Sequence, residues 1–126
     1  MQAKITLPGR SYTKKNSQQI TYNHKTGRRG LIQSPQYQRY ETACLWHLKN
    51  YHGPAFKGPV HVQARYWMPD RRSWPDLMGL LQATCDILEK AGIIDNDRDV
   101  ISLDGSRIMG VDKDNPRAEI FIEEAE

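Results

Sequence analysis

The sequence predicts a single α+β domain in which a small mixed β-sheet packs against two helices. Two stretches with one apolar face at helical spacing alternate with short apolar stretches rich in β-branched residues. With 126 residues, the chain is long enough for one hydrophobic core and too short for two. No stretch reaches the roughly 18 apolar residues that cross a membrane, and two cysteines are too few for a disulfide scaffold. We therefore expect one reduced, cytoplasmic domain over residues 1–126 without a membrane partner.

The N-terminal region is expected to form a strand and then a basic arm. Residues 3–7 are apolar and β-branched, and Gly9 follows the end of this strand. Polar and basic residues then dominate, with short strands expected at 20–22 and 30–33 on either side of a long turn. We interpret residues 8–33 as a basic loop or hairpin arm.

Each of the two predicted helices has a recognisable beginning and end. Ser34 is a suitable N-cap and Pro35 a suitable first residue for a helix whose apolar positions continue until Gly53. The second helix is expected over residues 76–91, with Gly92 at the position where glycine commonly follows a helix.

Three strands complete the predicted sheet. Alternation of apolar and polar residues indicates a strand over 60–68, and further strands are expected over 100–109 and 118–122. Asp104-Gly105 is also a typical two-residue hairpin turn. We favour one long strand with a bulge at Gly105, because the halves would otherwise be only about four residues long.

The charge of the chain is unevenly divided along its length. Residues 1–69 carry eleven Lys or Arg and one acid, whereas residues 70–126 carry seven Lys or Arg and fourteen acids. This division predicts a basic region, which attracts phosphate backbone, beside an acidic one. Carboxylates tolerate nearby phosphate when a divalent cation lies between them. The alternative is chance segregation of charge on solvated faces.

Acidic residues concentrate around the second predicted helix. Asp76 stands at its beginning and Asp97 follows its end. Because the helix is about 22 Å long, these two residues meet only if residues 93–97 fold back alongside it. Asp86 lies about 15 Å along the axis from Asp76 and is expected to be structural, paired with Lys90.

An EF-hand calcium loop does not explain the acids after this helix. Asp95, Asp97 and Asp99 match the alternating first positions of such a loop. The loop then requires Gly where the chain has Val100, and Glu where it has Ser106.

Five segments, in the order of the predicted elements, resemble one nuclease family. They are Ile5-Thr6-Leu7-Pro8, Met68-Pro69-Asp70-Arg71-Arg72, Pro75-Asp76-Leu77, Leu88-Glu89-Lys90-Ala91-Gly92 and Asp95-Asn96-Asp97. In these segments the chain is similar to the RusA family of Holliday-junction resolvases. The resemblance covers most of the chain.

The resemblance implies a homodimeric, magnesium-dependent endonuclease that cuts four-way DNA junctions in recombination and repair. Carried over onto this sequence, the first and last catalytic aspartates are Asp76 and Asp97, and Asp95 is a further candidate ligand of Mg²⁺. The implied partners are branched DNA and a second copy of the chain, in a bacterial or phage-infected cell. Without a metal, Asp76 is interpreted as a helix N-cap and Asp97 as a solvated turn residue.

Three positions depart from the motif of that family. Its second Asp, its Asn and its Lys fall on Met78, Gly79 and Gln82. A thioether is a soft ligand that Mg²⁺ does not take, and a neutral amide supplies no positive charge to a developing anion. Asp70 and Glu89 are further carboxylates available in their place. The second hypothesis is therefore a catalytically silent relative that binds branched DNA without cutting it, and the third is a protein-binding adaptor.

Two sets of residues are candidates for contacts with DNA. Arg71, Arg72 and Trp74 lie between two prolines, in a rigid loop that would present two cations beside a stacking ring. The second set consists of the basic residues of the arm: Lys14, Lys15, Arg28 and Arg29. A solvated loop is the alternative interpretation of the first set, and a disordered basic arm, which is compatible with nonspecific binding of DNA, is the alternative for the second.

Overall fold

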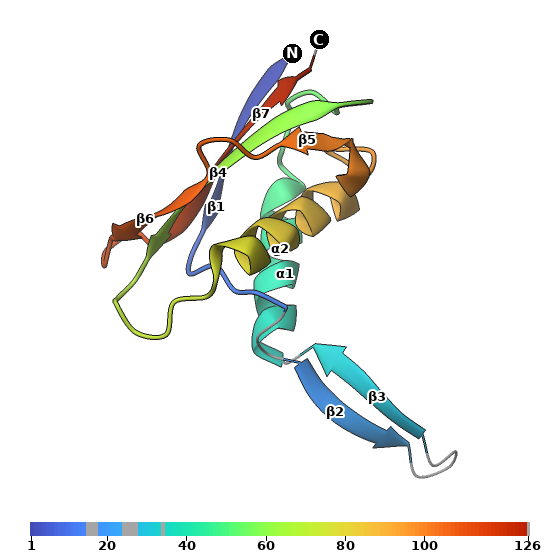
Figure 1. Cartoon of the computed structure of the whole chain (residues 1–126), viewed down its shortest axis with the longest axis vertical. Helices are drawn as coiled ribbons and strands as arrows, with labels where there is room; N and C mark the ends of the chain where they lie inside the picture. Colours follow the sequence, from blue (N-terminus) through green and yellow to red (C-terminus); the bar gives the residue numbers. More distant parts are fainter. Residues whose placement is uncertain (15–17, 24–27, 34, 126) are drawn as a thin grey trace.

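The computed structural model describes residues 1–14, 18–23, 28–33 and 35–125, with only the backbone course given for 18–23 and 28–33. It contains a five-stranded mixed sheet, a two-stranded hairpin and two α-helices (Figure 1). The strands are β1 (Gln2–Pro8), β2 (Gln18–Asn23), β3 (Arg28–Gln33), β4 (Val60–Met68), β5 (Val100–Ser102), β6 (Arg107–Val111) and β7 (Arg117–Glu124). The helices are α1 (Pro35–Leu48), α2 (Leu77–Lys90) and the 3-10 turn η1 (Asp97–Asp99). The predicted α+β class is confirmed.

The sheet is built around β4, which has neighbours along both edges. β7 runs antiparallel to β4, and β1 pairs antiparallel with β7. Along its other edge, β4 has β5 and β6 as parallel neighbours. Parallel neighbours require a crossover, and α2 supplies it by connecting β4 to β5 across one face of the sheet (Figure 1).

The strand predicted over residues 100–109 is interrupted. β5 and β6 are separate segments on β4, with a turn over residues 103–106 between them. Gly105 has φ +83°, and a Cβ at this position would clash with the side chain of Gln63. The irregularity predicted at Gly105 is confirmed, but the continuous strand is wrong because the turn breaks the pairing. The hairpin alternative is also wrong, since in this fully described stretch both segments pair with β4 instead of with each other.

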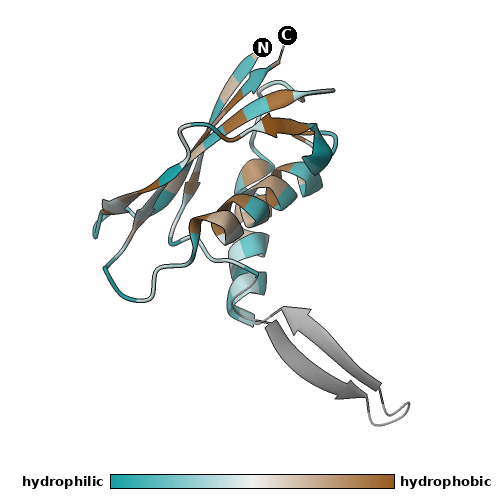
Figure 2. Ribbon diagram, viewed as in Figure 1, coloured by the Kyte–Doolittle hydropathy of each residue, from teal (hydrophilic) through white to brown (hydrophobic). Residues whose placement is uncertain are grey.

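The core lies between the sheet and the helices, and the two helices contribute unequally to it. β4 alternates buried with more exposed side chains, as its sequence predicts. In Figure 2 the hydrophobic colour extends along α2, whereas α1 is mainly pale or hydrophilic. The buried residues of α2 are Gly79, Leu80, Leu81, Ala83, Thr84, Cys85, Ile87 and Leu88, and those of α1 are Tyr37, Tyr40, Cys44 and Leu48. α2 is therefore the central helix of the domain.

The segment after β1 packs against both helices instead of forming a free arm. Ser11 and Thr13 are buried, and the ring of Tyr12 meets that of Tyr40 edge-on at a centroid distance of 5.6 Å. A Cβ on Gly79 would approach Thr13 Cγ2 to 3.0 Å, so the glycine lets this segment lie against the beginning of α2. The extended arm is therefore restricted to the hairpin of β2 and β3, which projects from the body near the start of α1 (Figure 1).

The predicted helix boundaries are close to the observed ones. α1 begins at Pro35 as expected, while its predicted N-cap, Ser34, lies outside the described residues. α2 ends with Ala91 as its C-cap, and Gly92 follows with φ +76°. Among the described residues, none of the helices has the length and apolar character needed to cross a membrane.

Candidate functional site

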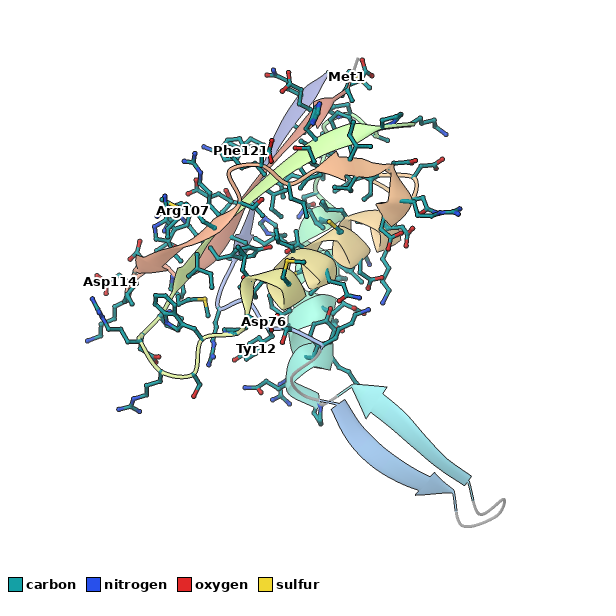
Figure 3. The ribbon with its side chains drawn as sticks, in the orientation of Figure 1. Met1, Tyr12, Asp76, Arg107, Asp114 and Phe121 are labelled. Carbon is teal, nitrogen blue, oxygen red and sulfur yellow. The ribbon has the colours of Figure 1, made fainter. Side chains whose placement is uncertain are left out.

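Asp76 caps the beginning of α2. Its backbone is extended, with φ −72° and ψ 145°, and its Oδ2 accepts a hydrogen bond of 3.1 Å from the backbone N–H of Gly79. An aspartate at this position satisfies a free helix N–H and interacts favourably with the positive end of the helix dipole. Figure 3 shows Asp76 at the start of α2, near Tyr12 of the N-terminal segment. The N-cap interpretation of Asp76 is confirmed, and one of its two carboxylate oxygens is already engaged.

Asp97 lies beside the second half of the same helix. After α2 the chain turns back, and the backbone N–H of Ile93 donates to Leu88 O at 3.0 Å. The backbone N–H of Asp97 donates to Glu89 Oε1 at 3.1 Å. Burial, together with the nearby Asp97 carboxylate, raises the pKa of the Cys85 thiol to about 11. The fold-back that the sequence left open therefore occurs, and it places Asp97 near Cys85 and Glu89.

Asp76 and Asp97 are separated along α2. Asp76 precedes Glu89, whose carboxylate accepts the hydrogen bond of Asp97, by thirteen residues, which corresponds to about 20 Å along a helix axis. A magnesium ion holds its oxygen ligands at about 2.0–2.1 Å, so one ion does not bridge the two ends of this segment. Within the part of the chain that the structure describes, no three acidic, histidine or cysteine side chains are grouped as metal ligands. Asp95 is exposed and does not complete such a group.

The three replaced motif positions lie on α2, and two of them, Met78 and Gln82, are exposed. Met78, Gln82, Cys85 and Glu89 recur at intervals of four, three and four residues, which places them along one side of the helix. Met78 is 71% exposed, so its side chain does not fill the core. This side of α2 is the candidate functional surface, and a hard oxygen and a cation are missing from its first two turns. Helical spacing from Met78 is the sequence signal that identifies Glu89 as part of this surface. Glu89 is predicted from the sequence only as a carboxylate available in place of a missing motif residue.

Asp86 and Glu41 form a different acidic group, in which both carboxylates are paired with lysines. Asp86 Oδ2 lies 2.8 Å from Lys14 Nζ and 3.3 Å from Lys90 Nζ, and Lys90 lies 3.1 Å from Glu41 Oε1. Burial would raise the pKa of Asp86, but the hydrogen bonds and charges of Lys14 and Lys90 outweigh it and lower the pKa. The predicted Asp86–Lys90 pair is confirmed. Lys14, a candidate for contact with DNA, joins the N-terminal segment to α2 through its ion pair with Asp86.

The loop between β4 and α2 holds two arginines in an ordered turn. The backbone N–H of Arg72 donates to Asp70 Oδ1 at 2.8 Å, and the indole N–H of Trp74 donates to the Asp70 carbonyl. Arg10 Nη2 donates to Ser73 O at 3.1 Å, and Ser73 adopts φ +46°. These contacts fix the backbone and leave the side chains of residues 71, 72 and 74 exposed. The contact from Arg10 could not be predicted from the sequence, because it joins residues 63 positions apart.

The remaining arm residues are only partly placed. Arg28 and Arg29 lie on β3, where only the backbone is described, and Lys15 lies outside the described residues.

A comparison with family models gives a match over residues 9–123 to the family described as endodeoxyribonuclease RusA. The chain belongs to the RusA family. The match includes the arm, the β4–α2 loop, α2 and η1, so the resemblance seen in the sequence is confirmed over most of the chain. A search of curated proteins found no match.

Proposed function

We propose that this RusA-family protein is a structure-selective endonuclease that acts on branched DNA, with the four-way junction as its substrate. The observation that carries the proposal is the family match over residues 9–123, which spans every candidate residue named above. A four-way junction has two-fold symmetry, so a homodimer would present two equivalent sites to symmetric strands.

Recognition of DNA is assigned to the β4–α2 loop. Arg71 and Arg72 are exposed beside the half-exposed ring of Trp74, on a backbone held by Asp70 and Arg10. An ordered loop loses less conformational entropy on binding than a loose one, and arginines bind phosphate oxygens well. The loop directly precedes Asp76, so phosphates bound here lie at the beginning of α2.

The residues around α2 fit magnesium at one of its two ends. Asp76 and Asp97 together do not fit one ion, for the reason of distance given above. Asp97 and Glu89 fit better, because Glu89 Oε1 already lies 3.1 Å from the Asp97 backbone nitrogen and both side chains supply hard oxygens. Magnesium commonly takes one or two carboxylates, with water and substrate phosphate completing its shell. When bound, it supplies electrophilic polarisation of a phosphate.

A second candidate function is binding of branched DNA without cleavage. The specific observation that favours it is the exposed side of α2, where Met78 and Gln82 replace an aspartate and a lysine of the family motif. The separation of Asp76 from Asp97 along α2 also favours binding without cleavage. Both candidates share the DNA-recognition surface and differ only in strand scission.

Asp97→Asn distinguishes the two candidates in a cleavage assay on an end-labelled four-way junction. Cleavage requires that wild type produces paired nicks with Mg²⁺ and none with EDTA, and that Asp97→Asn slows nicking at least about 100-fold. Asp114→Asn is the matched control, since this exposed aspartate lies in the turn between β6 and β7, far from α2 (Figure 3). Junction binding without nicks supports the silent candidate. No junction binding even at low salt overturns both and favours a protein-binding adaptor.

A further inference from the structure

The outer side of α1 carries an exposed tryptophan. Trp46 is 68% exposed, although tryptophan side chains are usually largely buried. It lies at the edge of a shallow depression of about 510 Å³. The residues that line this depression are Pro35, Gln38, Arg39, Thr42, Ala43 and Trp46. The opposite side of α1 faces the core, so this outer surface is not needed to bury the helix.

The charges on this surface are all positive. Arg39 and Lys49 are exposed, and Lys49 Nζ lies 4.3 Å from the centre of the Trp46 ring. Glu41 is the only acid within residues 35–50, and it is directed towards α2, where it accepts two hydrogen bonds of 3.1 Å from Lys90. Within this fully described helix and the two residues after it, no carboxylate remains to neutralise Arg39 or Lys49.

This charge distribution favours a polyanion over a second copy of the same surface. A two-fold contact would place Arg39 and Lys49 against cations of the other chain, which is unfavourable. The open face of the sheet differs, since it presents both signs of charge, including Lys4 and Glu123. The open face of the sheet could therefore pair opposite charges with a second copy of itself, whereas the outer surface of α1 could not.

The spacing along α1 suits the backbone of duplex DNA. The Lys49 ammonium lies over the ring of Trp46, which follows Arg39 by seven residues, or about 10 Å along the helix. This separation is comparable with the roughly 12 Å width of the major groove, so the two cations reach phosphates of one duplex arm. Between them, the Trp46 indole offers an N–H donor to phosphate and an apolar ring to deoxyribose.

We propose that the outer surface of α1, formed by Arg39, Trp46 and Lys49, is a second DNA-binding surface that contacts the phosphates of a duplex arm. This inference rests on the proposed action on branched DNA. It adds a contact on a different element from the loop that carries Arg71 and Arg72. Two separate contacts on one protomer would fix the direction of one duplex arm relative to the branch point.

The test measures binding of a fluorescent four-way junction in EDTA over a range of salt concentrations. Arg39→Ala with Lys49→Ala should lower the slope of log K against log salt by about two and weaken binding at least about tenfold at 0.1 M salt. Trp46→Ala should weaken binding several-fold and leave the slope unchanged. Lys113→Ala, at an exposed lysine of the β6–β7 turn, is the control. Lys49→Gln is the second variant, should the double variant fail to fold.

Three outcomes overturn the inference, and they are distinguishable from failure of the proposed function. An unchanged slope in the α1 double variant, together with a reduced slope in Arg71→Ala with Arg72→Ala, overturns only the α1 surface. A change from dimer to monomer in Trp46→Ala, seen by sedimentation, identifies the surface as a self-association interface instead. Absence of junction binding by wild type overturns the proposed function and the inference together.

Discussion

Two groups of carboxylates border α2, and they differ in what surrounds them. Asp86 and Glu41 are bound by the ammonium groups of Lys14 and Lys90. Asp76 and Glu89 instead accept hydrogen bonds from backbone N–H groups, and no ion pair of the described residues includes Asp76 or Asp97. A carboxylate neutralised by lysines joins segments of the fold, whereas one without a cation keeps its charge for a metal ion or a solvent molecule. Sequence clustering alone does not separate these two roles.

The largest effect is expected from a variant that restores the missing carboxylate and ammonium groups on α2, between Asp76 and Asp97. Met78→Asp with Gln82→Lys places a hard oxygen and a cation on the exposed side of α2, and we expect junction nicking with Mg²⁺ to rise at least about 100-fold. The rate of appearance of nicked strands is the measurement. Met78→Leu is the control, because it keeps an exposed apolar side chain there. If the double variant nicks no faster than wild type, separation of Asp76 from Asp97 limits the chemistry instead.

A smaller effect is expected on stability, when an aspartate from each of the two acidic groups is replaced by alanine. Asp86→Ala leaves the partly buried Lys14 without its carboxylate and leaves Lys90 with Glu41 alone, so we expect it to lower the free energy of unfolding by about 1 kcal/mol. Asp97→Ala should change it by less than about 0.5 kcal/mol, because Asp97 is exposed and outside the ion pairs. Urea unfolding followed by circular dichroism measures both. Equal losses would show that the two groups do not differ in their structural role.

The smallest expected effect is the acid dependence of the paired group. The pKa of Asp86 lies below its ordinary value in the folded protein, so the folded state binds fewer protons than the unfolded chain near that ordinary value. The stability it contributes is present above the unfolded pKa of about 3.9 and is lost as pH falls through the folded value. Urea unfolding between about pH 6 and pH 3 should therefore show a shallower acid decline in Asp86→Asn than in wild type. Identical declines would assign the acid sensitivity to other groups.

The sequence predicted the regular elements well because their signals are local. The apolar spacing of α2, its N-cap Asp76 and the glycine after its end all act within one or two turns. The alternation of β4 similarly reports the two faces of one strand. Each of these predictions depends on residues that are neighbours in the chain, so tertiary packing did not reverse them.

Predictions that depended on long-range neighbours were less successful. The interruption between β5 and β6 became visible only in their separate pairing with β4, a strand about 40 residues earlier in the chain. The packing of Thr13 against Gly79 and the pairing of Lys14 with Asp86 bring together segments more than 60 residues apart. A basic residue in a polar stretch has the same local pattern whether it faces solvent or a distant aspartate.

By itself, the sequence determined the α+β class, the positions of both helices, the membership of the RusA family and the replacement of two motif residues by Met78 and Gln82. Only the tertiary structure decided which acids are paired with lysines and at which end of α2 Asp97 lies. The physical reason is the separation along the chain of the residues that interact, since helix caps and apolar periodicity involve residues only a few positions apart. Ion pairs and metal sites depend instead on distances of a few ångströms between side chains that only folding brings together.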